Sequence, residues 1–328
     1  MQTVRIAVIG AGYWGTKLAC EYSLLSQAIE DVYLNSVVDT SRERLDALRQ
    51  QLKNDGVNFS TEYEEILRDD SVDAVHIAIP NHLHYETARM ALEAGKHVLL
   101  EKPMTTSSKE ALELAGLSEK QGLVLHVGHI FRFNNAVRKV GEIIRQGILG
   151  KIFYASLIWA SDIEPPKDRD IIFDLAPHPV DVLNYLLDEW PFTVCATAGS
   201  FLRGEAGREE VAFINLDFPS RTLANIYVSW IDHGTKQRTV RIVGEKGSLV
   251  CDALNQSVTI HTREEQMRSM EVLVNNTIRD MQLHFIDGIR GSGSPRLNNP
   301  SVGASTVQVL EAIANSVRSK SFVSLSFL

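Results

Sequence analysis

The chain has 328 residues and a mass of 36.5 kDa, which is enough for two domains that each bury a core. With 44% hydrophobic and 23% charged residues, its composition is that of an ordinary soluble globular protein. A net charge of −8 without a basic cluster argues against nucleic acid as a partner. No apolar run approaches the ~20 residues that span a bilayer, so we expect no membrane partner either.

Cysteine usage and the N-terminus both bear on the compartment. Cys20, Cys195 and Cys251 lie far apart and form no C-x-x-C pair, so we expect neither a disulfide framework nor a zinc site. The chain enters a strand directly, without a charged and then apolar signal segment. We therefore expect reduced thiols and a cytoplasmic location.

The first element is an apolar run, Val4 to Ile9, which predicts a buried parallel strand. It is followed by glycines in the G-x-G-x-x-G spacing and then by a predicted helix over residues 16–25. The first glycine allows a tight turn, the second lets a pyrophosphate approach the backbone, and the third lets helix and strand pack closely. The phosphates then meet unpaired N–H groups at the helix N-terminus. The residues predicted to bind the cofactor here are Gly10, Gly12, Tyr13, Trp14 and Gly15.

A second apolar strand, Tyr33 to Val38, ends in Asp39, which follows the last glycine of the motif by 39 − 15 = 24 residues. This is close to the roughly 20 residues expected for the acid that binds the ribose. Asp39 favours NAD, because a carboxylate accepts from the 2′-hydroxyl and repels a 2′-phosphate. Arg42 can tolerate that phosphate, so NADP stays open. A Gly-rich turn in some other α/β protein is the alternative that this context disfavours.

Strands and helices alternate as far as the fifth strand. Further strands are predicted at 74–79, 97–100 and 123–127, and helices at 41–52, 63–67, 84–94 and 107–120. Such alternation predicts a doubly wound parallel sheet with right-handed crossovers. Ligands bind at the carboxyl ends of such strands. Those ends carry the Gly loop, Asp39, Pro80 to His84, Glu101 to Pro103, and Gly128-His129.

After a predicted helix at 134–146 the pattern changes to strands that follow strands. They are predicted at 152–160, 194–202, 211–218, 223–230, 238–244, 249–251 and 257–261. Helices are predicted from Pro177 onward, at 276–289 and at 302–317. The fold class is therefore α/β, with a dinucleotide-binding Rossmann domain at 1–128. A second domain is expected at 129–328, of the α+β class and built on a largely antiparallel sheet.

Three polar side chains are candidates for catalysis. Lys102 follows the carboxyl end of a strand, where a lysine can hold a substrate hydroxyl and stabilise negative charge. The alternative is a solvated surface lysine, which the position at the strand end disfavours. Asp174 and His178 are four residues apart, and Pro177 and Pro179 confine them to the start of a helix. Histidine suits proton transfer near neutral pH, and a carboxylate can orient it or bind a hydroxyl. An N-cap Asp with a surface His is the alternative.

The remaining candidates carry less information. No carboxylate or cysteine completes a ligand set around the histidines at 82, 84, 126 and 129, so no metal site is expected. Instead, we expect His82 and His84 to line the cofactor pocket. Arg132 either binds an anionic group of the substrate or forms a structural ion pair, and both interpretations stay open. Asp181 is expected to be structural or to orient His178.

In chain order, the Gly loop, AIPNHLH, EKP, GHIFRFN and DLAPHPVD make the sequence resemble the Gfo/Idh/MocA family of nicotinamide-dependent oxidoreductases. The resemblance covers essentially the whole chain. It implies hydride transfer from a sugar or cyclitol hydroxyl, with Lys102, Asp174 and His178 in contact with that hydroxyl. It also implies that the second domain binds substrate and that its sheet is open, with a homodimer or homotetramer formed through the exposed sheet face. The chain departs from the commoner family pattern at Ala176, where glycine is frequent, and at Pro179, where the residue is often polar. We expect Pro179 to affect the shape of the substrate that is accepted.

The resemblance also assigns cofactor contacts to the strand ends. It places Asn81, His84 and Glu101 near the nicotinamide half, and Pro80 and Lys102 belong to the same predicted cofactor-binding set. The DLAPH and VSW…VGEKGSLVCD stretches look most like members that oxidise the 3-hydroxyl of a UDP-linked N-acetylhexosamine or its uronate. Two other functions stay open: an NAD-retaining glycosidase of the same superfamily, and a non-catalytic protein that senses cofactor or sugar.

Overall fold

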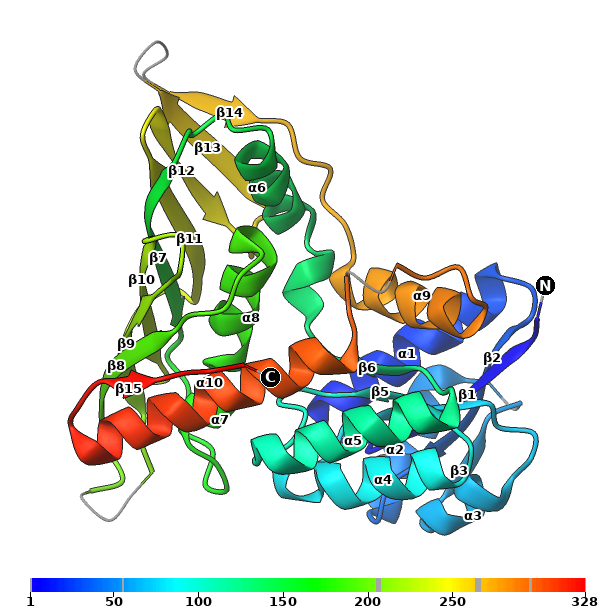
Figure 1. Ribbon diagram of the computed structural model, residues 1–328. Coiled ribbons are helices and arrows are strands. Elements are labelled where there is room, and N and C mark those ends of the chain that lie inside the picture. The colour runs from blue at the N-terminus through cyan, green and yellow to red at the C-terminus, as the bar shows by residue number, and fades with distance from the viewer. Residues whose placement is uncertain (1, 55, 205–207, 263–266, 295–296, 328) are drawn as a thin grey trace. The chain divides into compact units, whose positions relative to one another are not determined.

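The computed structural model describes residues 2–54, 56–204, 208–262, 267–294 and 297–327. They form two compact units (Figure 1). The first unit comprises Met1–His129 and Ile278–Ala304, and the second comprises Ile130–Thr277 and Ser305–Leu328. The contiguous boundary predicted at 128/129 therefore leaves out a late segment that folds with the N-terminal residues.

The first unit contains a six-stranded parallel sheet with the order β3-β2-β1-β4-β5-β6. Its strands are β1 (Val4–Ile9), β2 (Val32–Val38), β3 (Asn58–Ser60), β4 (Ala74–Ile77), β5 (His97–Leu100) and β6 (Leu125–Val127). The apolar runs form the inner strands because helices cover both faces of the sheet. The strand order reverses between β1 and β4, and dinucleotides bind at such a reversal.

Helices follow the strands as expected. They are α1 (Tyr13–Ala28), α2 (Arg42–Leu52), α3 (Tyr63–Arg68), η1 (Asn81–Leu83), α4 (His84–Glu93) and α5 (Ser108–Gln121). The pairs α1–α2 and α4–α5 each pack together, as the right-handed crossovers of a doubly wound sheet require (Figure 1). Ser41 caps the N-terminus of helix α2, and its hydroxyl accepts from the Arg44 N–H at 3.3 Å.

Helix α9 (Thr277–Ile289) and the segment after it complete the first unit. The Gln282 amide donates to the Leu18 carbonyl at 3.1 Å. The Asn298 side chain bonds both backbone groups of Val127, donating to its carbonyl at 2.6 Å and accepting from its N–H at 3.2 Å. These bonds satisfy the backbone at the edge strand β6, which explains why residues so late in the chain belong to this unit.

The second unit is built on a nine-stranded sheet with the order β14-β13-β12-β11-β7-β10-β9-β8-β15. Its strands are β7 (Ile152–Ala160), β8 (Thr193–Gly199), β9 (Val211–Asp217), β10 (Leu223–Ser229), β11 (Gln237–Gly244), β12 (Gly247–Asp252), β13 (Ser257–Thr262), β14 (Arg268–Met270) and β15 (Val323–Ser324). The central β7–β10 pair is parallel and the neighbouring pairs are antiparallel. The largely antiparallel sheet that the sequence predicts is confirmed.

Helices of this unit cover one face of the sheet (Figure 1). They are η2 (Ile130–Phe133), α6 (Asn135–Arg145), α7 (Ile171–Asp174), α8 (Pro177–Leu187) and, from residue 305 on, α10 (Pro300–Ser319). The core side chains alternate along the strands, as in Ala224, Ile226 and Val228 of β10. Within the described ranges, no helix is both long enough and apolar enough to cross a bilayer.

Candidate functional site

The glycine loop after β1 has the geometry that a dinucleotide needs. Gly10 has φ +103°, and a Cβ there would lie 2.2 Å from the Ala78 carbonyl oxygen. A Cβ on Gly15 would lie 1.9 Å from the Gly10 oxygen, whereas Gly12 has nothing within 4 Å. Helix α1 starts beside Gly12 with no side-chain cap and no acidic residue in its first turn. Its N–H groups and its dipole thus suit a pyrophosphate.

Asp39 joins the end of β2 to this loop. Its Oδ2 accepts from the Ala11 N–H at 2.7 Å and its Oδ1 accepts from the Ser41 N–H at 2.8 Å. The guanidinium nearest to Asp39 is that of Arg44, whose Nη1 lies 3.7 Å from the Asp39 Oδ2. Arg42, which we named from the sequence as the arginine near the ribose, is exposed. Arg44 lies in the first turn of α2. Its proximity to Asp39 can therefore be predicted only once Ser41 is known to cap this helix.

A buried polar cluster lies beneath the carboxyl end of β5. His76 Nε2 is 3.3 Å from the Glu101 Oε1, and the side chains are 0% and 9% exposed. Burial raises the pKa of Glu101, but the hydrogen bond and charge of His76 and the charge of Lys102 outweigh it and lower the pKa below its ordinary value. A Cβ on Gly128 would lie 2.7 Å from a carboxylate oxygen of Glu101, so a larger residue there would displace this carboxylate.

His84 is oriented by two carbonyls and has no exposed surface. Its Nδ1 lies 2.8 Å from the Pro103 oxygen and its Nε2 lies 3.0 Å from the Ile79 oxygen. Burial lowers the pKa of His84, although both hydrogen bonds act in the opposite direction. His84 therefore connects the strand end at Ile79 with the strand end that carries Lys102, and this placement indicates a supporting role rather than contact with a cofactor.

Other predicted residues of this unit lie at the same strand ends. Lys102 is half-buried between the buried residues Glu101 and Pro103. Pro80 is exposed and Asn81 is half-buried at the start of η1. Tyr13 is 80% exposed and its hydroxyl accepts from Lys17 Nζ at 2.8 Å. Polar groups thus follow β1, β2, β4 and β5 at one edge of the parallel sheet.

In the second unit, Asp174 and His178 belong to two successive helices. Asp174 is the last residue of α7, whose N-cap Asp170 accepts from the Phe173 N–H at 2.9 Å. Helix α8 begins at Pro177, so His178 lies in its first turn, as expected. The sequence spacing suggests one helical turn through Asp174 and His178, but in the structure the helix is interrupted between Asp174 and Pro177. Pro177 and Pro179 have no backbone N–H to donate to the preceding turn. The His178 ring packs edge-on against Phe131, with centroids 5.2 Å apart.

Sequence reasoning missed two arginines beside Asp174. Arg169 Nη1 lies 3.4 Å from the Asp174 Oδ1, and its guanidinium also pairs with Asp168. Arg238 on β11 is 7% exposed; burial lowers its pKa to about 10, while the charge of Asp174 raises it. The short sequence separation between Arg169 and Asp174 could have suggested this contact. It does so only when α7 is known to bring the two side chains together.

Arg132 is a structural residue in this unit. Its Nε donates to the Asp181 Oδ1 at 2.7 Å and its Nη2 donates to the Asn184 Oδ1 at 2.7 Å. The Arg132 and Asp181 side chains are 2% and 1% exposed. Of the two interpretations left open for Arg132, the structure shows the structural ion pair, and the guanidinium is buried with its partners instead of facing an anionic substrate group.

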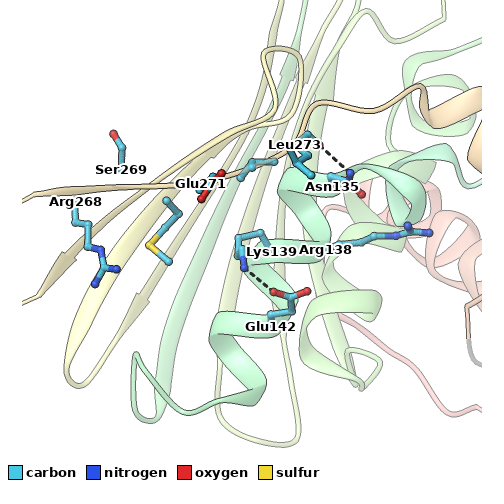
Figure 2. A pocket seen from close by; sticks show the side chains of 10 residues that line it. Asn135, Arg138, Lys139, Glu142, Arg268, Ser269, Glu271 and Leu273 are labelled. Carbon is cyan, nitrogen blue, oxygen red and sulfur yellow. Dashed lines mark hydrogen bonds and ion pairs between the residues drawn. The ribbon is translucent and has the colours of Figure 1, made fainter.

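A cavity of about 710 Å³ in the second unit lies between α6 and the segment that begins with β14 (Figure 2). Figure 2 shows Lys139 bonded to Glu142, at 2.8 Å, and the Asn135 amide donating to the Leu273 carbonyl, also at 2.8 Å. Asp174 and His178 do not line it. Because the candidate catalytic residues are not among its lining residues, we do not assign the reaction to this cavity.

Two family profiles match the chain. One is described as an oxidoreductase family with an NAD-binding Rossmann fold and covers residues 4–129; the other is the GFO/IDH/MocA C-terminal domain and covers residues 137–250. An oxidoreductase of Synechocystis sp. is 31% identical over 285 residues, which are 79% of this chain and 74% of the relative.

Characterised relatives act on sugars. The UDP-N-acetylglucosamine 3-dehydrogenase of Acidithiobacillus ferrooxidans is 29% identical over 261 residues, which cover 79% of this chain and 77% of that enzyme. A levoglucosan dehydrogenase solved with NADH and L-sorbose superposes with a TM-score of 0.88 over 100% of both chains. At 20% identity that likeness shows a common fold.

Proposed function

Because this chain belongs to the Gfo/Idh/MocA family of oxidoreductases and is an NAD-dependent dehydrogenase acting on a CH–OH group of a sugar or cyclitol, we propose that its substrate is a nucleotide-linked sugar oxidised at the 3-hydroxyl. The relative that acts on UDP-N-acetylglucosamine supports this substrate. The observation that carries the proposal is the intact set of Lys102, Asp174 and His178, each at the end or start of an element.

Each side chain has a role in this proposal. His178 removes the hydroxyl proton, because an imidazole accepts protons near neutral pH. Lys102 holds the same oxygen and stabilises its developing negative charge. Asp174 accepts a hydrogen bond from a neighbouring hydroxyl and so orients the ring. When bound, NAD supplies the redox chemistry by accepting the hydride.

Cofactor binding is assigned to the first unit. The N–H groups at the start of α1 would hold the pyrophosphate, and Asp39 would accept from the ribose hydroxyls. Asn81 and Glu101, near the strand ends, would approach the nicotinamide half. His84 would contribute indirectly, by fixing the backbone next to Lys102.

Substrate screening with matched variants tests this function. The purified chain with NAD is offered UDP-N-acetylhexosamines, their uronates, free sugars and inositols, and NADH formation is followed by absorbance. His178→Asn should abolish most turnover while the dissociation constant for NADH changes little. Lys102→Ala should be at least as damaging to turnover. Lys109→Ala, which removes an 85% exposed lysine, is the control. Release of free sugar without net NADH would instead identify a glycosidase, and tight sugar binding without turnover would identify a sensor.

We also propose that the open face of the nine-stranded sheet forms a homo-oligomer. Phe213 on β9 is 50% exposed and stacks on Tyr227 of β10, with ring centroids 5.0 Å apart. Strand pairing continues this row to Ile158 on β7, and Leu223 and Tyr154 form a second pair that is 55% and 43% exposed. Exposed aromatic side chains gathered on a sheet face are typical of a protein interface.

A further inference from the structure

The Asp174 carboxylate interacts with two arginines of its own unit. Arg169 approaches Oδ1 at 3.4 Å and is itself fixed by Asp168, with Nε and Nη2 bonded to the two carboxylate oxygens at 3.1 and 3.0 Å. The buried Arg238 interacts electrostatically with Asp174 and is held by Nη1 bonds to the Ala160 and Gln237 carbonyls at 3.0 and 2.6 Å.

The loop that carries Arg169 is fastened by another arginine. Arg203 Nη1 donates to the Pro166 carbonyl at 2.6 Å and to the Arg169 carbonyl at 3.2 Å. The guanidinium therefore fixes the backbone on both sides of residues 167–168. Arg208 adds a bond from Nη1 to the Lys167 carbonyl at 2.6 Å.

Arg203 is in turn anchored by a buried acid. The Glu210 side chain is 0% exposed, and its Oε1 accepts from Arg203 Nε at 3.1 Å. The two Glu210 oxygens also accept the backbone N–H groups of Phe201, Leu202 and Arg203 at 2.8–2.9 Å. A carboxylate bonded in this way has little freedom, so Arg169 is presented to Asp174 by a rigid support.

Building on the proposed function, we propose that Arg169 is a positioning residue that holds one oxygen of the Asp174 carboxylate so that the other accepts a hydrogen bond from the substrate. A carboxylate can only accept hydrogen bonds, so its partner on the substrate must be a donor. The substrate therefore carries a hydrogen-bond donor, a hydroxyl or an amide N–H, beside the carbon that is oxidised. A sugar in which that neighbouring donor is removed or methylated leaves Asp174 without its partner and loses kcat/KM.

Kinetics of a variant set test this role. Arg169→Gln should lower kcat/KM for the sugar by about 10- to 100-fold, the range typical of losing a hydrogen bond to a charged group, while the KM for NAD stays unchanged. Arg169→Lys should recover part of the loss, because the positive charge is retained. Arg208→Gln is the matched control, at an exposed arginine outside this loop, and should retain near wild-type kinetics because Arg208 bonds the Lys167 carbonyl and not Asp174.

Combination with Asp174→Asn separates positioning from a general structural effect. If Arg169 acts through Asp174, the Arg169→Gln/Asp174→Asn double variant should be no slower than Asp174→Asn alone. A full additional loss in the double variant, or an equal loss in Arg208→Gln, would overturn the proposal.

A second readout does not need turnover. Labelling the full chain with a water-soluble carbodiimide and glycine ethyl ester, followed by peptide mass spectrometry, reports how accessible and how well paired each carboxyl is. Asp174 should be labelled several-fold faster in Arg169→Gln than in wild type or Arg208→Gln. Equal labelling in all three overturns the pairing whatever the activity. A chain that oxidises no sugar refutes the proposed function instead, and the labelling still decides whether Arg169 holds Asp174.

Discussion

Arg132 and Asp181 form an ion pair that is almost completely enclosed, with Nε 2.7 Å from Oδ1 and side chains 2% and 1% exposed. Asp181 lies one helical turn after His178 on α8, and Arg132 is next to Phe131, which packs against the His178 ring. The pair therefore joins η2 to α8 at the point where the candidate base is positioned.

Removing one member of this pair should destabilise the second unit strongly. Asp181→Leu leaves a buried guanidinium without its carboxylate, which costs about 3–5 kcal/mol, whereas Arg132→Met/Asp181→Leu removes both charges and should recover most of that loss. Urea unfolding followed by tryptophan fluorescence measures this, because Trp159, Trp190 and Trp230 lie in this unit. A double variant as unstable as the worse single variant would show that the charges are not the cause.

The first unit should lose stability in acid because of His126. Its ring stacks on His284 with centroids 5.0 Å apart, and burial together with the His284 charge lowers the pKa of His126 to about 3. The unfolded chain takes up this proton near pH 6.5 and the folded chain does not, so stability is present above pH 6.5 and falls as the pH drops toward 3.

His126→Phe should reduce that dependence. Between pH 6 and 4 the slope of unfolding free energy against pH should decrease by up to about 1.4 kcal/mol per pH unit, which corresponds to one proton. His82→Gln, at an exposed position, controls for the loss of an imidazole. An unchanged slope in His126→Phe would mean that other groups, such as the buried His84, account for the acid sensitivity.

Asp39 should set the preference between NAD and NADP. Its carboxylate faces Arg44 at 3.7 Å and would repel a 2′-phosphate, whereas Arg44 would attract one. Asp39→Ser should therefore weaken NADH binding and lower the ratio of the NADPH to the NADH dissociation constant by about 10-fold or more. Fluorescence titration measures both constants. Adding Arg44→Gln or Arg42→Gln to Asp39→Ser shows which arginine attracts the 2′-phosphate, because loss of that arginine weakens NADPH binding. The position of Arg44 beside Asp39 predicts the larger effect for Arg44→Gln.

Much of this architecture could be predicted because its signals are local. The apolar run of β1, the glycines and Asp39 are all read within one strand–loop–helix unit, and the alternation of strands predicts the sheet. What could not be predicted depends on long-range contacts. No pattern in the sequence around Asn298 predicts its hydrogen bonds to Val127. Likewise, the sequence around Arg132 is equally consistent with an ion pair to Asp181 and with a contact to substrate.

The open sheet face should hold copies of the chain together. Phe213→Glu places a charge in the row formed with Tyr227 and Ile158, where it would be desolvated if a second sheet packs there. Sedimentation velocity over a range of concentrations should show a smaller species for this variant than for wild type. Leu273→Glu changes a 78% exposed side chain outside the sheet face and serves as the control. If both variants sediment like wild type, the aromatic face is not the interface, and assembly must use another surface.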